Sequence, residues 1–86
     1  EKKIPESFLY LAMAESNFSP KARSKVRAGG LWQFMPRTAK KMGLRINRHI
    51  DERFDPIKST KAATAYLKFL YNRFKKWYLV AIAYNC

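Results

Sequence analysis

Glu15 is the residue of this sequence whose type and setting best suit acid–base chemistry. It follows an apolar run over residues 8–14, with Phe8 seven and Leu11 four positions before it. In a helix these spacings place the three side chains on one face. Burial on such a face raises the pKa of a carboxyl, as a general acid near neutral pH requires. On spacing alone, a solvent-facing carboxylate at a helix end is the more common case.

Many glycosidases place two carboxylates across the scissile bond, and no second carboxylate is evident here. Glu6 lies nine residues before Glu15, about two and a half helical turns away and on the opposite side. Asp55 precedes a proline, as a helix cap would. Asp51 and Glu52 fall in an irregular segment that leaves their positions open. A mechanism with one carboxylate would need help from the substrate itself.

Metal binding and nucleophilic catalysis find little support in the sequence. His49 and Cys86 are the only residues of their kinds, too few for the three or four ligands of an ordinary metal site. A lone loop histidine and a lone terminal cysteine are also far more often incidental than a catalytic pair. Gly29 and Gly30 lack the spacing and the following lysine of a phosphate-binding loop. We therefore expect neither a metal nor a cofactor.

Another group of residues has the side chains of a sugar-binding cleft. Ring faces stack on sugars, and amides bind their hydroxyl and acetamido groups. The candidates are Trp32, Gln33, Tyr84 and Asn85. For the two aromatic residues, packing in a core is the more common role.

Four helices would position these residues, and no stretch has a convincing strand pattern, so the expected fold class is all-α. The first helix spans about residues 5–17, with Pro5 in its first turn and most of its faces buried. Pro36 opens a short second helix, which Gly43 ends as a left-handed cap. Residues 44–54 form an irregular segment.

The third helix has the clearest pattern. Asp55 caps its start and Pro56 takes its first turn. Apolar positions then recur at spacings of three and four, opposite a polar face. The predicted inward residues are Ile57, Thr60, Ala63, Leu67, Leu70 and Phe74. The predicted outward residues are Lys58, Lys61, Lys68, Asn72 and Lys75. A fourth helix starts near Trp77 and runs to the end of the chain.

The composition fits one small folded domain with a basic surface. The chain has 86 residues, of which 48% are hydrophobic and 15% aromatic, and this content favours a core over disorder. A formal net charge of +12 suits nucleic acid, acidic lipid or bacterial cell wall, although a solvated surface is the more common explanation. The sequence lacks a signal peptide and a final helix-stop signal. We expect residues 1–86 to be one domain of a longer chain, with any targeting segment or membrane anchor outside them.

Four motifs in order resemble the lytic transglycosylases of the goose-lysozyme-like superfamily. They are Glu15-Ser16, the stretch from Ser24 to Pro36 with Gly30-Leu31-Trp32-Gln33 inside it, the block from Asp51 to Thr60, and Ala83-Tyr84-Asn85. Arg27 stands where the family usually has glycine. Each motif alone is weak, but all four at family spacing form a specific signal. Trp32 and the third block look most like the membrane-bound murein transglycosylase D type.

The resemblance implies a lysozyme-like helical domain, incomplete at its C-terminus, with Glu15 as general acid and base. Glu15 would cleave the β-1,4 bond between N-acetylmuramic acid and N-acetylglucosamine, helped by the substrate's acetamido group, and leave a 1,6-anhydro ring. The implied cleft residues are Ser24, Gln33, Met35, Tyr84 and Asn85, with Tyr84 orienting Glu15 or the sugar and with Ser16 and Trp32 as supports. The implied partner is peptidoglycan in the bacterial cell envelope, and the oligomeric state is open.

Three other functions stay in view. A lysozyme-type hydrolase would use water on the same fold, and a non-catalytic wall-binding domain would keep the cleft without turnover. A basic nucleic-acid binder would use the positive charge, and its binding would weaken steeply with salt. That last function leaves Glu15, Gln33 and Asn85 unexplained, so we expect no nucleic-acid partner.

Overall fold

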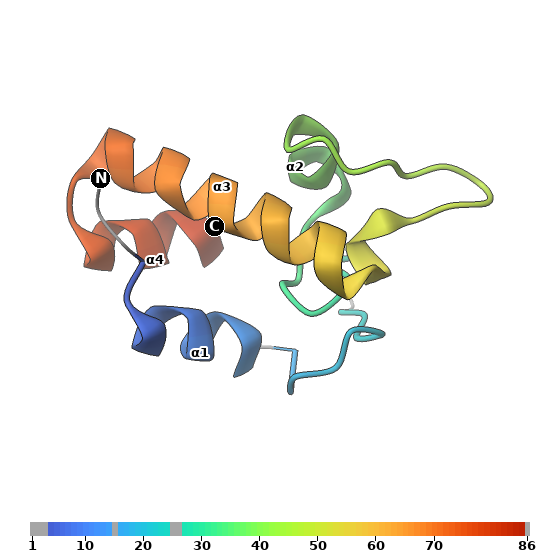
Figure 1. Cartoon of the computed structure of the whole chain (residues 1–86), viewed down its shortest axis with the longest axis horizontal. Helices are drawn as coiled ribbons and strands as arrows, with labels where there is room; N and C mark the ends of the chain where they lie inside the picture. The colour runs from blue at the N-terminus through green and yellow to red at the C-terminus, as the bar shows by residue number, and fades with distance from the viewer. Residues whose placement is uncertain (1–3, 15, 25–26, 86) are drawn as a thin grey trace.

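The longest helix, α3, runs across the molecule, and the other elements lie along its length (Figure 1). The structure, a computed structural model, describes residues 4–14, 16–24 and 27–85. In this part of the chain the elements are α1 (Glu6–Ala14), α2 (Pro36–Lys41), the 3₁₀ helix η1 (Glu52–Phe54), α3 (Pro56–Phe74) and α4 (Trp77–Asn85). Strand-like pairing is limited there to isolated bridges. The all-α prediction is therefore confirmed.

Asp55 caps α3 as the sequence predicts. Its carboxylate accepts hydrogen bonds from the backbone amides of Ile57 and Lys58, both at 2.9 Å, and Pro56 lies in the first turn. The helix ends at Phe74, because Lys75 takes a left-handed conformation with a φ of 65°. The cap and the stop together set the length of the helix on which the rest of the fold packs.

The buried stripe of α3 follows most of the predicted pattern. The inward residues that are buried or half-buried are Thr60, Ala63, Leu67, Leu70 and Phe74. The prediction for Ile57 is wrong, since its side chain is 71% exposed. A helix turns by about 100° per residue, so the six positions from Ile57 to Ala63 leave Ile57 about 120° from the stripe. Of the predicted outward residues, Lys68 is half-buried and the others are exposed.

Gly43 ends α2 as a left-handed cap, which confirms that prediction. Its φ is 91°, and its amide donates to the Lys40 carbonyl at 3.1 Å. The amide of Leu44 donates to the Ala39 carbonyl at 3.0 Å, which completes a Schellman motif. The chain therefore leaves α2 at a sharp angle and enters the long projecting loop before η1 (Figure 1).

Helix α1 is shorter and more exposed than the sequence suggests. It ends at Ala14 rather than Asn17, and the chain turns through left-handed conformations at Asn17 and Phe18. Pro5 lies just before the helix, where its carbonyl accepts two amides of the first turn. Tyr10 faces solvent, so the helix buries one side only.

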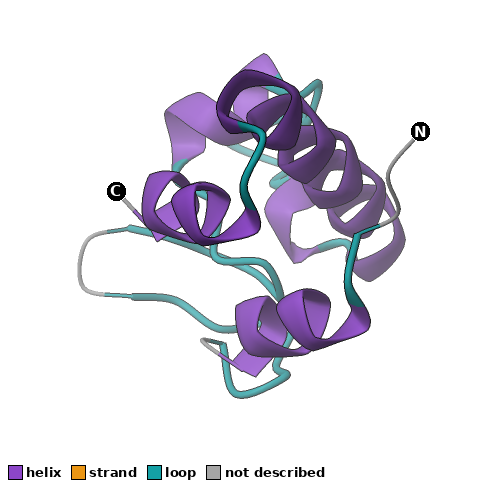
Figure 2. Cartoon of the chain, turned by 90° about the vertical axis from the view of Figure 1, so that its left-hand side faces the viewer, coloured by secondary structure: helices purple, strands orange, loops and turns teal. Residues whose placement is uncertain are grey.

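Two adjoining clusters form the core. One surrounds the buried rings of Trp32 and Phe34 and includes residues of α2 and α3. The other lies where α3 and α4 run side by side and contains Leu67, Leu70 and Val80 (Figure 2). Residues of α1 pack against both clusters. The first cluster is the one that supports the candidate site.

Candidate active site

The segment from Ala22 to Phe34 folds back on itself and carries much of the second motif. Gly29 and Phe34 exchange two backbone hydrogen bonds of 3.0 and 3.1 Å. The amide of Gly30 donates to the Ala22 carbonyl at 2.8 Å. These bonds fix the tight turn that holds Gln33 in a left-handed conformation, with a φ of 53°.

The side chains of Ser24 and Gln33 are both tied into this loop. The Ser24 hydroxyl oxygen accepts the backbone amide of Ala28 at 2.9 Å. The Gln33 amide group donates to the carbonyl of Gly30 at 2.8 Å and to that of Ala22 at 3.3 Å. Both side chains are half-buried, so they are held by the loop while part of each meets solvent.

Tyr84 fastens α4 to the loop across 52 residues of sequence. Its hydroxyl donates to the backbone carbonyl of Trp32 at 2.6 Å. Burial raises the pKa of the Tyr84 phenol well above its usual range, with a smaller contribution from the nearby Tyr66. The group therefore stays a neutral donor. This bond brings the second and fourth motifs together.

Trp32 belongs to the core rather than to an open surface. It is 3% exposed, and its indole nitrogen donates to the Thr60 hydroxyl at 2.8 Å. The core-packing role considered for this residue is confirmed. Because its carbonyl also receives Tyr84, Trp32 links α3 and α4 through one residue.

Arg53 holds the loop over residues 22–34 through hydrogen bonds to its backbone carbonyls. The sequence did not predict this role. The side chain is 6% exposed. One of its terminal nitrogens donates to the carbonyls of Arg27 at 2.6 Å and Phe34 at 3.0 Å, and the other pairs with Asp51 at 2.7 Å. Gly30 packs so closely against Arg53 that an added Cβ would overlap the Arg53 backbone carbonyl. The signal for this anchor was a single arginine directly after two acidic residues, Asp51 and Glu52, before the α3 cap.

Arg27 takes a backbone conformation that glycine adopts more easily. Its φ is 74°, in the left-handed region. Glycine adopts this conformation without the steric cost that a Cβ brings. An arginine can occupy it at a cost of about 1 kcal/mol, and the hydrogen bond from Arg53 to its carbonyl helps hold it.

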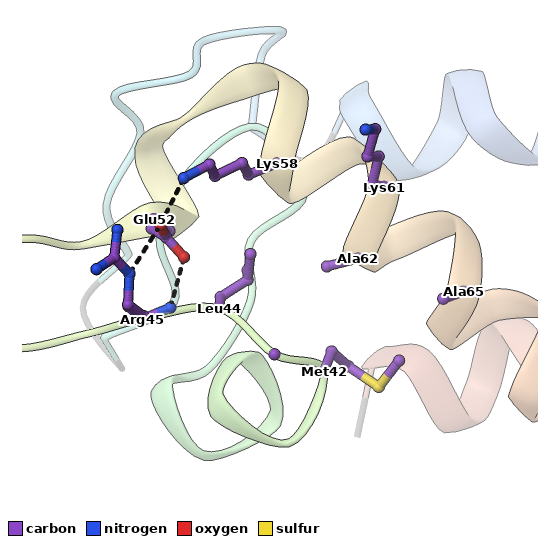
Figure 3. A pocket seen from close by; sticks show the side chains of 9 residues that line it. Met42, Leu44, Arg45, Glu52, Lys58, Lys61, Ala62 and Ala65 are labelled. Carbon is purple, nitrogen blue, oxygen red and sulfur yellow. Dashed lines mark hydrogen bonds and ion pairs between the residues drawn. The ribbon is translucent and has the colours of Figure 1, made fainter.

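Glu52 joins the segment before η1 to the first turn of α3. It is buried and accepts the Arg45 backbone amide at 2.7 Å and the Lys58 ammonium at 2.9 Å (Figure 3). The Arg45 amide and then the Lys58 ammonium lower the pKa of the Glu52 carboxyl to about 2. The Arg53 guanidinium likewise holds the pKa of Asp51 below its usual value. Both carboxylates therefore act as hydrogen-bond and ion-pair partners that stabilise the fold.

The carboxylates of the described residues therefore offer no second catalytic acid. Asp51 and Glu52 are ion-paired, and Asp55 caps α3. Glu6 is exposed in the first turn of α1. The Glu15 carboxyl, on which the chemistry depends, lies outside the described residues.

The remaining predicted site residues fall into three situations. Ser16 is buried, and its hydroxyl donates to the Met13 carbonyl at 2.8 Å, which supports the end of α1. Met35 is exposed and precedes α2 directly. The side chain of Asn85 lies outside the described part. The structure thus brings Ser24, Gln33, Trp32 and Tyr84 into one connected unit.

Within residues 4–14, 16–24 and 27–85, no group of three or more His, Cys, Asp or Glu side chains could hold a metal ion. No helix in the same ranges has the length and apolar character needed to cross a bilayer.

Comparison with known proteins identifies the family. The family model described as the transglycosylase SLT domain matches residues 1–86. The chain belongs to this family. Membrane-bound lytic murein transglycosylase D of Escherichia coli K12 is 36% identical over 86 residues, covering 99% of this chain and 19% of that protein. Soluble lytic murein transglycosylase of the same strain is 35% identical over 78 residues, covering 85% of this chain and 12% of that protein. This SLT chain spans a fifth or less of either relative.

Proposed function

We propose that this SLT chain is the catalytic part of a peptidoglycan lytic transglycosylase with Glu15 as its acid and base. The observation that carries the proposal is the hydrogen bond from Tyr84 to the Trp32 carbonyl. It joins the turn that carries Gln33 to the helix that carries Asn85, and both segments match sugar-binding motifs of the family. The match of the family model to the whole chain supports the same function.

The reaction needs one carboxyl group and the substrate. Protonated Glu15 donates its proton to the glycosidic oxygen as the bond to C1 of N-acetylmuramic acid breaks. The acetamido group of the same sugar stabilises the positive charge on C1. The Glu15 carboxylate then takes the proton of the sugar's 6-hydroxyl while that oxygen bonds to C1, which closes the 1,6-anhydro ring and regenerates the acid. No water is consumed.

The loop supplies positioning groups for the sugar in this proposal. The Gln33 amide hydrogens are used within the loop, which orients its amide oxygen to accept a sugar N–H or O–H. The Ser24 oxygen accepts a backbone amide, which leaves its proton for a sugar oxygen. Tyr84 acts as a positioning residue, because its hydroxyl is already bonded to Trp32. Asn85 and Met35 would line the edges of the cleft.

The proposed substrate places the chain in the bacterial cell envelope with peptidoglycan strands as its partner. The net charge of +12 would favour approach to the anionic polymers of the wall. Sequence-selective duplex binding that persists at physiological salt would contradict this assignment.

The deciding experiment is mass spectrometry of fragments released from purified peptidoglycan by the chain and by its Glu15→Gln variant. We expect fragments ending in 1,6-anhydro-muramic acid, and a loss of at least about 100-fold in the variant, because a general acid contributes roughly 10²–10⁴ in rate. Glu6→Gln is the matched control, since it removes an exposed carboxyl from the other end of α1 and should leave the rate unchanged.

Other outcomes assign other functions. Fragments with reducing ends would show a lysozyme-type hydrolase on this fold. Glycan binding without release of fragments would show a wall-binding domain. An unchanged rate in Glu15→Gln, with circular dichroism like that of the parent chain, would remove Glu15 from the chemistry.

A further inference from the structure

A concave surface lies between the end of α2, the segment after it and one face of α3 (Figure 3). It is an open groove of about 450 Å³. That volume falls in the range of small-ligand sites, roughly 300–1,000 Å³. The lining residues are Met42, Gly43, Leu44, Arg45, Glu52, Lys58, Lys61, Ala62 and Ala65. None of the residues assigned to the proposed catalytic cleft is among them.

The lining has two parts of different chemistry. Its apolar part consists of small or flexible groups, chiefly Met42, Leu44, Ala62 and Ala65. Its charged part has three cations, Arg45, Lys58 and Lys61, against the single carboxylate of Glu52. The formal charge of the lining is therefore +2, from three positive groups and one negative group.

The single carboxylate of the groove is already satisfied by its own neighbours. Arg45 and Lys58 both pair with Glu52, at 3.2 and 2.9 Å, and Glu52 is buried beneath them. The pairing fixes the two cations at the groove while their side chains remain 65% and 52% exposed. Lys61 has no ion-pair partner among the described residues. An anion entering the groove would thus meet excess positive charge.

One face of α3 combines the two kinds of group in a regular order. Lys58 and Ala62 are four residues apart, as are Lys61 and Ala65, so their side chains are neighbours on the helix surface. A ligand that follows this face would meet a cation and a small apolar residue in each turn. Phosphate polymers have no apolar groups for such a floor, whereas a short peptide with carboxylates and small side chains matches both parts.

We infer that this groove is a binding site for a short acidic peptide with small apolar side chains. The carboxylates lie against Arg45, Lys58 and Lys61, and the side chains of the peptide cover Met42 and Ala65, which are the more exposed apolar residues of the lining. Leu44 and Ala62 belong to the core cluster that contains Trp32, so the groove shares a wall with the support of the candidate active site.

The test is a titration of the ¹⁵N-labelled chain with acetyl-Ala-Glu-Ala, observed by NMR. We expect saturable shifts of the Gly43, Leu44 and Arg45 amides that weaken with added salt, as contacts to exposed cations do. Lys61→Gln should weaken binding about two- to fivefold, the effect of one exposed charge pair. Ala65→Glu places a negative charge on the exposed part of the floor and should weaken binding at least about tenfold.

Matched controls carry the same changes in charge outside the groove. Lys76→Gln removes an exposed cation beyond the other end of α3, and Asn72→Glu adds a carboxylate to an exposed position of the same helix. Both should bind the peptide as the parent chain does. Equal weakening in the controls and the groove variants would overturn the inference, because it would reflect net charge alone.

Two other ligands complete the experiment. The neutral peptide acetyl-Ala-Gln-Ala-amide should bind much more weakly, and equal binding would overturn the role of the cations. Tripolyphosphate that shifts the same amides more strongly than the acidic peptide would assign the groove to phosphate polymers instead. Absence of saturable shifts with the acidic peptide would also overturn the inference. No glycan is present, so failure here leaves the proposed transglycosylase reaction untouched.

Discussion

The region around η1 and the contact between α3 and α4 hold this small domain together by different means. Around η1, buried charged groups pair with one another and with backbone carbonyls, as Arg53 does with Asp51, Arg27 and Phe34. Between α3 and α4 the buried groups are mainly apolar, with Leu67 at the centre. The difference follows from what packs in each region, which is a loop against η1 in the first and two helices in the second.

A helix presents a continuous apolar stripe, so hydrophobic burial alone can pack two helices. The loop over residues 22–34 has no such stripe, and its carbonyls need donors when they are buried. A guanidinium supplies several donors in a fixed geometry. The candidate site is therefore held together by directional hydrogen bonds and ion pairs. The pair of helices α3 and α4 is held together by the apolar volume and area that it buries.

The largest loss in the free energy of unfolding should come from Arg53→Met. The change removes the ion-pair partner of the Asp51 carboxylate and the side-chain donor of the Arg27 carbonyl, and removing one member of a buried ion pair typically costs about 3–5 kcal/mol. Urea unfolding followed by circular dichroism would measure the loss. The control Arg37→Met removes an exposed arginine from α2 and should change the free energy of unfolding by less than about 0.5 kcal/mol. A loss below about 1 kcal/mol in Arg53→Met would refute the role of the anchor.

We expect Leu67→Ala to lower the free energy of unfolding somewhat less, by about 3 kcal/mol, because removing the fully buried leucine side chain leaves a cavity between the helices. The same urea unfolding measurement applies. Phe69→Ala, at an exposed position of the same helix, is its control. Leu67→Met, which refills most of that volume, should lose less than about 1.5 kcal/mol, because volume-conserving apolar changes are tolerated best. Equal losses in Leu67→Met and Leu67→Ala would contradict the role of buried volume in this region.

The smallest effect should be a change in acid sensitivity in Glu52→Gln. The folded-state pKa of Glu52 lies near 2, below its ordinary value of 4.5, so the carboxylate stabilises the fold above about pH 5. That contribution is lost as the pH falls towards 2. Its cationic partners are largely exposed and screened by solvent, which limits its size. Thermal unfolding between pH 2 and 7 should show a flatter pH dependence in Glu52→Gln than in Glu6→Gln. Parallel curves would contradict this assignment.

Features fixed by neighbouring residues could be predicted from the sequence. The Asp55 cap and the Gly43 stop depend on local backbone chemistry, and both were found as expected. The inward face of α3 was largely correct, with Ile57 as the exception, because the helical turn places Ile57 about 120° from the buried stripe. The end of α1 was wrong because apolar composition alone does not mark where a helix stops.

Features that join distant residues could not be predicted in the same way. The motifs placed Gln33 and Tyr84 in one site, yet no local pattern indicates that Tyr84 bonds to the Trp32 carbonyl. Asp51 and Glu52 were left without a position. The ion pair of Glu52 with Lys58 forms only once η1 packs against α3, and Arg53 reaches the Arg27 carbonyl only once the loop folds against η1. The sequence therefore shows that charged residues lie near the loop, but it does not show which groups they contact.

The link between Trp32 and Tyr84 also has a consequence for the order in which the site is assembled during synthesis. The loop leaves the ribosome before Arg53, and well before Tyr84. Its carbonyls at Arg27 and Trp32 must wait for side-chain donors that are translated 26 and 52 residues later. A nascent chain that stops short of α4 would contain the Gln33 turn without the bond that holds it to its neighbour.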